Sequence, residues 1–279
     1  MTTEQFSELK EEILRRAKEA SACRGQYARA YKAETMQDLC NVIKDNFDWA
    51  YRNMVIDTAL LMLYRDDFAK NGIFVNTSVS KGYLLCGNAT VRAYGNATVK
   101  ACGNATVRAC DNATVEAWGN ATVKAYGNAT VEAWGNATVE AWGNATVEAY
   151  GNATVKACGN ATVRACDNAT VEAWGNATVK ALDNATVEAW GNATVKACGN
   201  ATVRACGNAT VEACGNATVR ACDNATVKAC DNATVEAWGN AYVSSYVIVE
   251  CKLSGNAIYR IRRDNIIRFA SDSLKFEKI

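Results

Sequence analysis

The sequence predicts a mainly β protein, a two-sided β-solenoid of about 16 residues per coil with a small α-helical N-terminal domain and a β-rich C-terminal cap. Three observations lead to this prediction. An eight-residue phrase, first written GNATVRAY, occurs nineteen times in succession over residues 87–238. Apolar and polar positions alternate within the phrase. The 279-residue chain contains no proline, which would remove a hydrogen bond from a sheet.

Residues 1–74 are expected to form the α-helical domain, with three or four short helices. The first apolar face has helical spacing and consists of Phe6, Leu9, Ile13 and Ala17. Two places are typical of helix starts and one of a helix end: Thr2 with Gln5, Thr35 with Asp38, and Asn71-Gly72. Because the apolar faces of these helices are large, we expect the helices to pack on one another and on the first repeats.

The eight positions of the repeat divide into a strand and a corner. Positions 3, 5 and 7 are Ala, Val and Ala in every copy, whereas positions 2, 4 and 6 are Asn, Thr and a charged residue. This alternation is typical of a strand with one dry face and one wet face. Since Arg, Lys and Glu replace one another at position 6, we expect that position to point outward. Position 1 is Gly or Asp and Asn always follows, which indicates a tight corner, as at Gly87-Asn88 and Asp111-Asn112.

The number of repeats per coil follows from the volume of the core. Stacked strands lie about 4.8 Å apart, so vertical neighbours are either two or three repeats apart in sequence. The charges at position 6 do not decide between these arrangements. A three-sided coil needs bulky residues in its middle, whereas Ala, Val and Ala fill only a thin gap between two sheets. We therefore predict two repeats per coil in a solenoid spanning residues 75–246, and a capping segment at residues 247–279.

Position 8 is the most variable position and is Tyr, Trp, Cys or Leu. Strict alternation places it outward, although the adjacent corner could turn it inward. One interpretation is that the position needs only a moderately apolar group. The other is a lane of exposed aromatic side chains for binding a partner, formed by Tyr94, Trp118, Tyr126, Trp134, Trp142, Tyr150, Trp174, Trp190 and Trp238.

Nine of the thirteen cysteines also lie at position 8. A two-repeat coil stacks Cys198, Cys214 and Cys230 in one lane, and Cys206 and Cys222 in the other. The expected separation permits disulfides, and a thiolate metal site is a further alternative. The odd number of cysteines and the charged N-terminus favour reduced thiols in a cytoplasmic protein. No metal or cofactor is predicted.

Composition argues against several classes of function. The chain has no histidine, no GxGxxG and no phosphate-binding loop, so we expect no enzyme and assign no catalytic residue. Glu116, Glu132 and Glu148 are expected to stack, but on a flat face without a pocket. The 30 basic and 29 acidic residues make nucleic acid an improbable partner. No apolar run approaches the roughly 20 residues that span a bilayer.

The repeats GNATVKAY and DNATVEAW resemble the octapeptide-repeat solenoids of bacterial and phage proteins of uncharacterised function. In period they are similar to the repeats of bacterial ice-nucleation proteins, whose 16-residue coils hold two octapeptides. The N-terminal stretch CRGQYARAYKAETMQDLCNVIKDNFDWAY resembles the leader attached to such repeats. The resemblance implies a solenoid and, for ice binding, outward Thr-x-Thr pairs. Here a charge replaces the second threonine, as in Thr90 followed by Arg92.

These considerations favour a non-catalytic repeat scaffold, a rigid rod for protein–protein interaction or self-association. The expected partner is a second copy, bound through the solenoid face or the helical domain, or an unknown protein. The alternative is a surface binder directed to ice or to nucleic acid.

Overall fold

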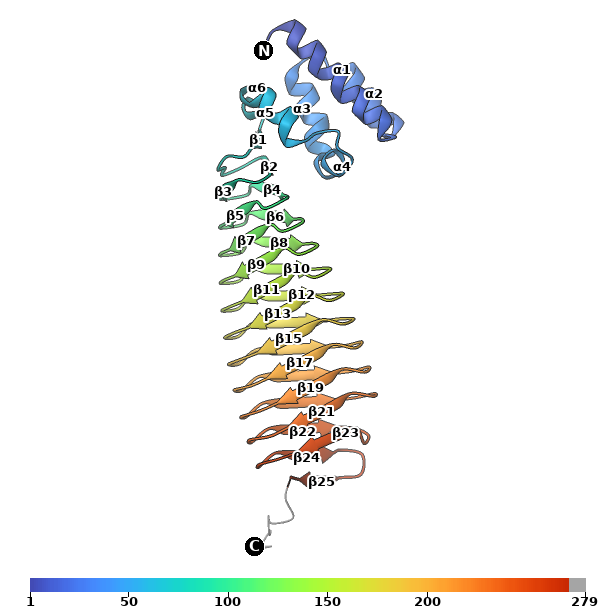
Figure 1. Ribbon diagram of the computed structural model, residues 1–279, viewed down its shortest axis with the longest axis vertical. Coiled ribbons are helices and arrows are strands. Elements are labelled where there is room, and N and C mark those ends of the chain that lie inside the picture. Colours follow the sequence, from blue (N-terminus) through green and yellow to red (C-terminus); the bar gives the residue numbers. More distant parts are fainter. Residues whose placement is uncertain (271–279) are drawn as a thin grey trace.

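The computed structural model describes residues 1–270 and consists of a helical domain at the N-terminal end of a long rod of stacked strands (Figure 1). The mainly β solenoid with N-terminal helices is as predicted.

The helical domain contains six helices among the described residues, not three or four. They are α1 (Thr3–Glu19), α2 (Arg24–Lys32), α3 (Met36–Asp45), α4 (Phe47–Arg52), α5 (Thr58–Leu63) and α6 (Arg65–Lys70). Helices α3 and α4 are separated only at Asn46, and α5 and α6 only at Tyr64, so the apolar pattern continues across both breaks. Helix α2 buries only Ala30 and therefore has almost no apolar pattern to detect.

The predicted helix ends are confirmed. Thr2 and Gln5 form a reciprocal capping box at the start of α1, and Thr35 and Asp38 form another at α3. Gly72 follows α6 with φ +79°, the left-handed conformation that glycine adopts without steric cost.

The rod begins with β1 (Ile73–Val75) and β2 (Tyr83–Cys86). Nineteen four-residue strands follow, one in each repeat at positions 4 to 7, from β3 (Thr90–Ala93) to β21 (Thr234–Ala237). The last strands described are β22 (Tyr242–Ser245), β23 (Glu250–Leu253), β24 (Ile258–Ile261) and β25 (Ile266–Phe269). The capping segment thus continues the solenoid before it closes the rod.

From β2 to β24, consecutive strands lie in two different sheets. The even sheet has 14 strands, namely β1, β2, the even-numbered strands to β24, and β25; the odd sheet has 11 strands, from β3 to β23. Neighbours in a sheet are parallel and pair residues 16 apart, as Thr146 with Thr162 and Val147 with Val163. The two-repeat coil is therefore confirmed. Within residues 1–270, the exceptions are at the two ends. Strands β1 and β2 pair Ile73 with Tyr83, β2 and β4 pair Tyr83 with Thr98, and β25 returns antiparallel to β24.

The core of the rod is thin and consists almost entirely of Ala and Val. Positions 3, 5 and 7 are fully or almost fully buried from Val91 to Ala237, apart from the half-buried Ala89 at the first corner. The helical domain has its own core, which Ile73, Val75 and Leu85 join. Because Leu84 and Cys86 of the same strand belong to the solenoid core, β2 is buried on both faces and connects the two parts.

The corners are built as predicted, with one exception. Position 1 has positive φ at Asp111 (61°) and at the later repeats, whereas Gly87 does not. Gly87 belongs to the first corner, which lies next to the helical domain. The Gly87 N–H donates to the Asn76 side chain and not to a neighbouring coil of repeats. The Asn at position 2 donates its backbone N–H to the position-1 carbonyl of the coil before, at 2.8 Å for Asn128 to Asp111.

Candidate interaction surfaces

The position-8 side chains lie along two opposite edges of the rod, because consecutive repeats belong to opposite sheets. The first edge follows the odd strands and carries Tyr94, Cys110, Tyr126, Trp142, Cys158, Trp174, Trp190, Cys206, Cys222 and Trp238. The second edge follows the even strands and carries Cys102, Trp118, Trp134, Tyr150, Cys166, Leu182, Cys198, Cys214 and Cys230. The nine aromatic residues of the predicted lane are thus divided between two surfaces.

On the second edge the aromatic rings stack on one another. Trp118 and Trp134 stack with their centroids 5.2 Å apart and their planes 5° apart. Tyr150 continues the stack at 4.1 Å from Trp134. The guanidinium of Arg52, in helix α4, lies 4.8 Å from the Trp118 ring. These rings are half-buried, so the stack is largely completed inside the molecule.

On the first edge the aromatic rings are more exposed. Tyr94 retains 38% of its accessible surface, and Trp142 and Trp174 retain 40% each. The small Cys158 lies one coil from both tryptophans and separates them. Trp174 stacks on Trp190 at 5.4 Å, but no ring stacks on its other side. The first edge therefore has two exposed rings, Trp142 and Trp174, on either side of a small residue.

The charged position 6 points outward from both sheets, as expected. Glu116, Glu132 and Glu148 stack directly on the even sheet, which confirms the predicted row. The face also carries the threonines of position 4, and most of these residues are exposed or half-buried. The result is a flat surface of alternating threonine and charged rows.

Lys100 is the exception, since only 2% of its side chain is exposed. Helix α4 covers it, and its Nζ contacts Asp48 at 2.8 Å and also the carboxylate of Glu116. Burial acts to raise the pKa of Asp48, but the hydrogen bonds from Lys100 and Arg52 outweigh it and leave the pKa lowered. In the coil beneath the helical domain, an acidic residue therefore cannot replace the basic residue at position 6 as it does in other repeats.

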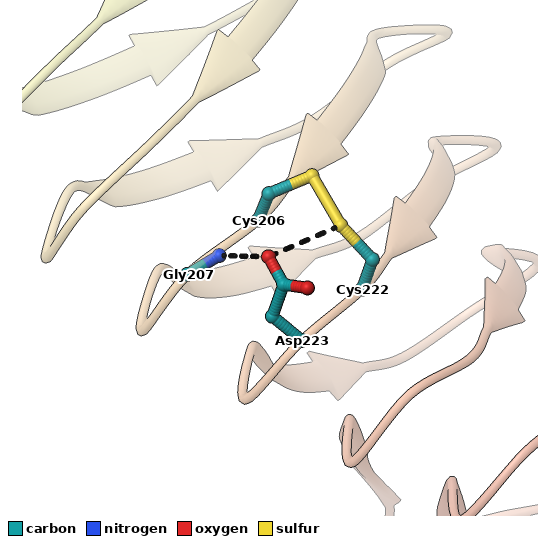
Figure 2. Close-up of a disulfide and its surroundings, with 4 residues drawn as sticks. All are labelled: Cys206, Gly207, Cys222 and Asp223. Atoms are coloured by element: carbon teal, nitrogen blue, oxygen red, sulfur yellow. Dashed lines mark hydrogen bonds between the residues drawn. A yellow bond between two sulfur atoms is a disulfide. The ribbon is translucent and has the colours of Figure 1, made fainter.

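The prediction that all cysteines are reduced is wrong at one place. Cys206 and Cys222 on the first edge form a disulfide across one coil, with their Cα atoms 4.9 Å apart (Figure 2). Direct stacking of identical repeat positions brings this pair within bonding distance. The other eleven cysteines are free. Cys198, Cys214 and Cys230 stack on the second edge, as the two-repeat coil requires.

Each aspartate at position 1 caps the coil that precedes it, a role that the sequence analysis missed. The Asp111 carboxylate accepts the N–H of Gly95 at 3.1 Å, and Asp223 accepts that of Gly207 at 3.0 Å. Asp167, Asp183 and Asp231 make the equivalent bond. The replacement of Gly by Asp was visible in the sequence, but its partner 16 residues away was not.

No protein-family model, curated protein or solved structure matches this chain. Within residues 1–270, no helix is both long enough and apolar enough to cross a membrane. What the structure establishes is a repetitive solenoid with a 16-residue coil.

Proposed function

We propose that the chain is a non-catalytic scaffold, a rigid rod that associates with a second copy of itself through the first edge. The observation that carries this proposal is the pair of exposed rings, Trp142 and Trp174, on either side of Cys158. Exposed apolar rows of this kind are typical of interaction surfaces. Tryptophan is also enriched among the residues that dominate binding free energy.

At most coils of this edge, the order of large and small residues is complementary to itself. If two copies lie antiparallel about a two-fold axis midway between Trp142 and Cys158, each Trp142 meets the Cys158 of the second copy. The same axis places Trp190 opposite Cys110, Tyr94 opposite Cys206, and the rings of Trp174 and Tyr126 opposite each other. A two-fold interface uses the same patch on both copies, so such a pattern favours a closed dimer rather than a fibre.

The alternative targets receive less support. On both faces the threonine rows alternate with charged rows, and charged groups hold liquid water in their own geometry. Acidic and basic residues are also mixed along each face, as at Glu148 beside Arg164 and Glu188 beside Arg204, which neither imitates nor complements a phosphate row.

Size-exclusion chromatography with light scattering tests the proposal. We expect the full chain to be a dimer at micromolar concentration, and W142A+W174A to be a monomer. Truncation of a central interface tryptophan typically costs about 2 kcal/mol or more, so the dissociation constant should rise at least about thirtyfold. The matched control is W118A+W134A, which removes two tryptophans from the second edge and should leave the dimer intact. A wild-type chain that is monomeric at all concentrations contradicts the proposal.

A further inference from the structure

The second edge carries a row of thiols that the proposed scaffold function does not use. Cys198, Cys214 and Cys230 occupy three successive coils. The acidic corner residue Asp231 directly follows Cys230. The sulfur atoms of Cys214 and Cys230 and a carboxylate oxygen of Asp231 all lie within 4.8 Å of one another.

The carboxylate is held in place by the fold. Asp231 accepts the backbone N–H of Gly215 at 2.9 Å and lies 3.7 Å from the sulfur of Cys230. This bond leaves lone pairs on the carboxylate free for a cation. Two fixed backbones, one coil apart, therefore position the three donor atoms before any ligand binds.

A hollow of about 120 Å³ adjoins the two thiols. Its wall includes Glu212, Lys228 and Arg262, and the first two form an ion pair at 3.6 Å. The carboxylates of Asp231 and Glu212 offset the charges of Lys228 and Arg262. A dication that replaces the two thiol protons therefore leaves the site without net charge. The hollow is thus suited to a cation with sulfur ligands.

The cysteines of the two edges differ in their oxidation state. Cys206, Cys222 and Asp223 have the same arrangement, and Asp223 likewise binds the N–H of Gly207 (Figure 2). There the two sulfur atoms are bonded to each other and are unavailable as thiolates. On the second edge they are free.

We propose that Cys214, Cys230 and Asp231 bind one thiophilic d10 cation of the Zn²⁺ type. Zinc–sulfur bonds are about 2.3 Å long, so two sulfurs on one ion lie at most about 4.6 Å apart. The donor atoms here lie within 4.8 Å of one another, so little or no movement is needed to bind one ion. Each cysteine that binds the cation gives its thiol proton to solvent, and no electron is transferred.

The test is a titration with Cd²⁺, whose thiolate complexes have a charge-transfer absorption that reports sulfur ligation. The protein is the full chain with C206S+C222S, so that the stacked cysteine pair of the first edge cannot bind the ion after reduction. We expect one ion per chain by elemental analysis after desalting, together with the charge-transfer band. Zn²⁺ should compete for the same site.

Matched variants separate this site from adventitious binding to thiols. C214S+C230S should abolish both the band and the bound ion. C158S+C166S should change neither, because the coil neighbours of Cys158 and Cys166 are not cysteines. D231N should weaken binding about tenfold or more, whereas D183N, which alters a corner aspartate on the same edge beside Leu182, should not. Circular dichroism checks that each variant is folded. Absence of bound Cd²⁺, or equal loss in C158S+C166S, overturns the proposal.

Discussion

At the scale of single residues, the corner determines which side chains the repeat tolerates. Position 1 has positive φ and approaches the coil before it closely; a Cβ added at Gly199 would lie 3.0 Å from the backbone N of Asp183. Glycine avoids this crowding, and aspartate compensates for it by capping an N–H that otherwise has no partner in the stack. Glycine and aspartate are therefore both tolerated at position 1, for different physical reasons.

Replacement of Asp111 tests this account. D111A removes the cap on Gly95 and leaves a Cβ at φ 61° without the local hydrogen bonding that favours Asp there. We expect a local cost of about 1–2 kcal/mol, and hence roughly tenfold faster hydrogen exchange in the peptide that contains Gly95. D111N keeps an acceptor and tolerates positive φ, so its exchange should stay close to that of the wild type. Equal exchange in all three proteins would show that the cap contributes nothing.

These residues also show where prediction from sequence ends. The alternation of Ala, Val and Ala with polar positions was sufficient for the strands, the two-sided coil and the stacking of Glu116 on Glu132, because the coil period relates every repeat to its neighbours. The burial of Lys100 was not predictable, since it depends on how helix α4 docks on the first coils. The sequence predicted that Cys206 and Cys222 lie on successive coils, but it did not predict the disulfide between them. Formation of the bond depends on side-chain orientation as well as on spacing.

At the scale of elements, the disulfide connects two successive strands of the odd sheet through a loop with a sequence separation of 16. A disulfide that closes a loop of about 15 residues stabilises a fold by about 3 kcal/mol, largely by restricting the unfolded chain. In a solenoid each coil contacts only its neighbours, so the stabilisation should be local to the C-terminal part of the rod.

We therefore expect reduction to destabilise the C-terminal part of the rod by about 3 kcal/mol. The measurement is hydrogen exchange of the coils around Cys206 and Cys222, with and without reductant. Coils near Thr130–Ala133 should not respond. The C206S+C222S variant is the control: it should resemble the reduced protein and show no further change on addition of reductant. A uniform response along the whole rod would contradict a locally acting bond.

At the scale of the whole molecule, the rod and the helical domain are stabilised by different interactions. The rod relies on continuous strand hydrogen bonds and a thin apolar core, and both are insensitive to pH. The helical domain relies in part on ion pairs: Arg16 contacts Glu12 at 2.6 Å and Asp57 at 2.8 Å. Asp48 of the same domain pairs with Lys100 of the rod at 2.8 Å. Acid should therefore act on the two parts unequally.

The pKa values give the direction of this effect. Hydrogen bonds from Arg15 and then Arg16 lower the pKa of Glu12 to about 2. The pKa of Asp57 is also lowered, because its bonds to the Leu60 backbone and to Arg16 outweigh burial. A carboxyl group whose pKa is lower in the folded than in the unfolded state stabilises the fold above its unfolded pKa. That contribution is lost as the pH falls through the folded pKa.

We thus expect acid to unfold the helical domain before the rod, between about pH 4.5 and pH 2. Circular dichroism should show loss of the helical signal while the β signal persists, and tyrosine or tryptophan fluorescence of the rod should change later. E12Q and D57N should shift the helical transition to higher pH or destabilise the domain at neutral pH, whereas E172Q on the exposed odd-sheet face should do neither. Simultaneous loss of both signals would mean that the helical domain and the solenoid unfold as one cooperative unit, with β2 transmitting the loss of one core to the other.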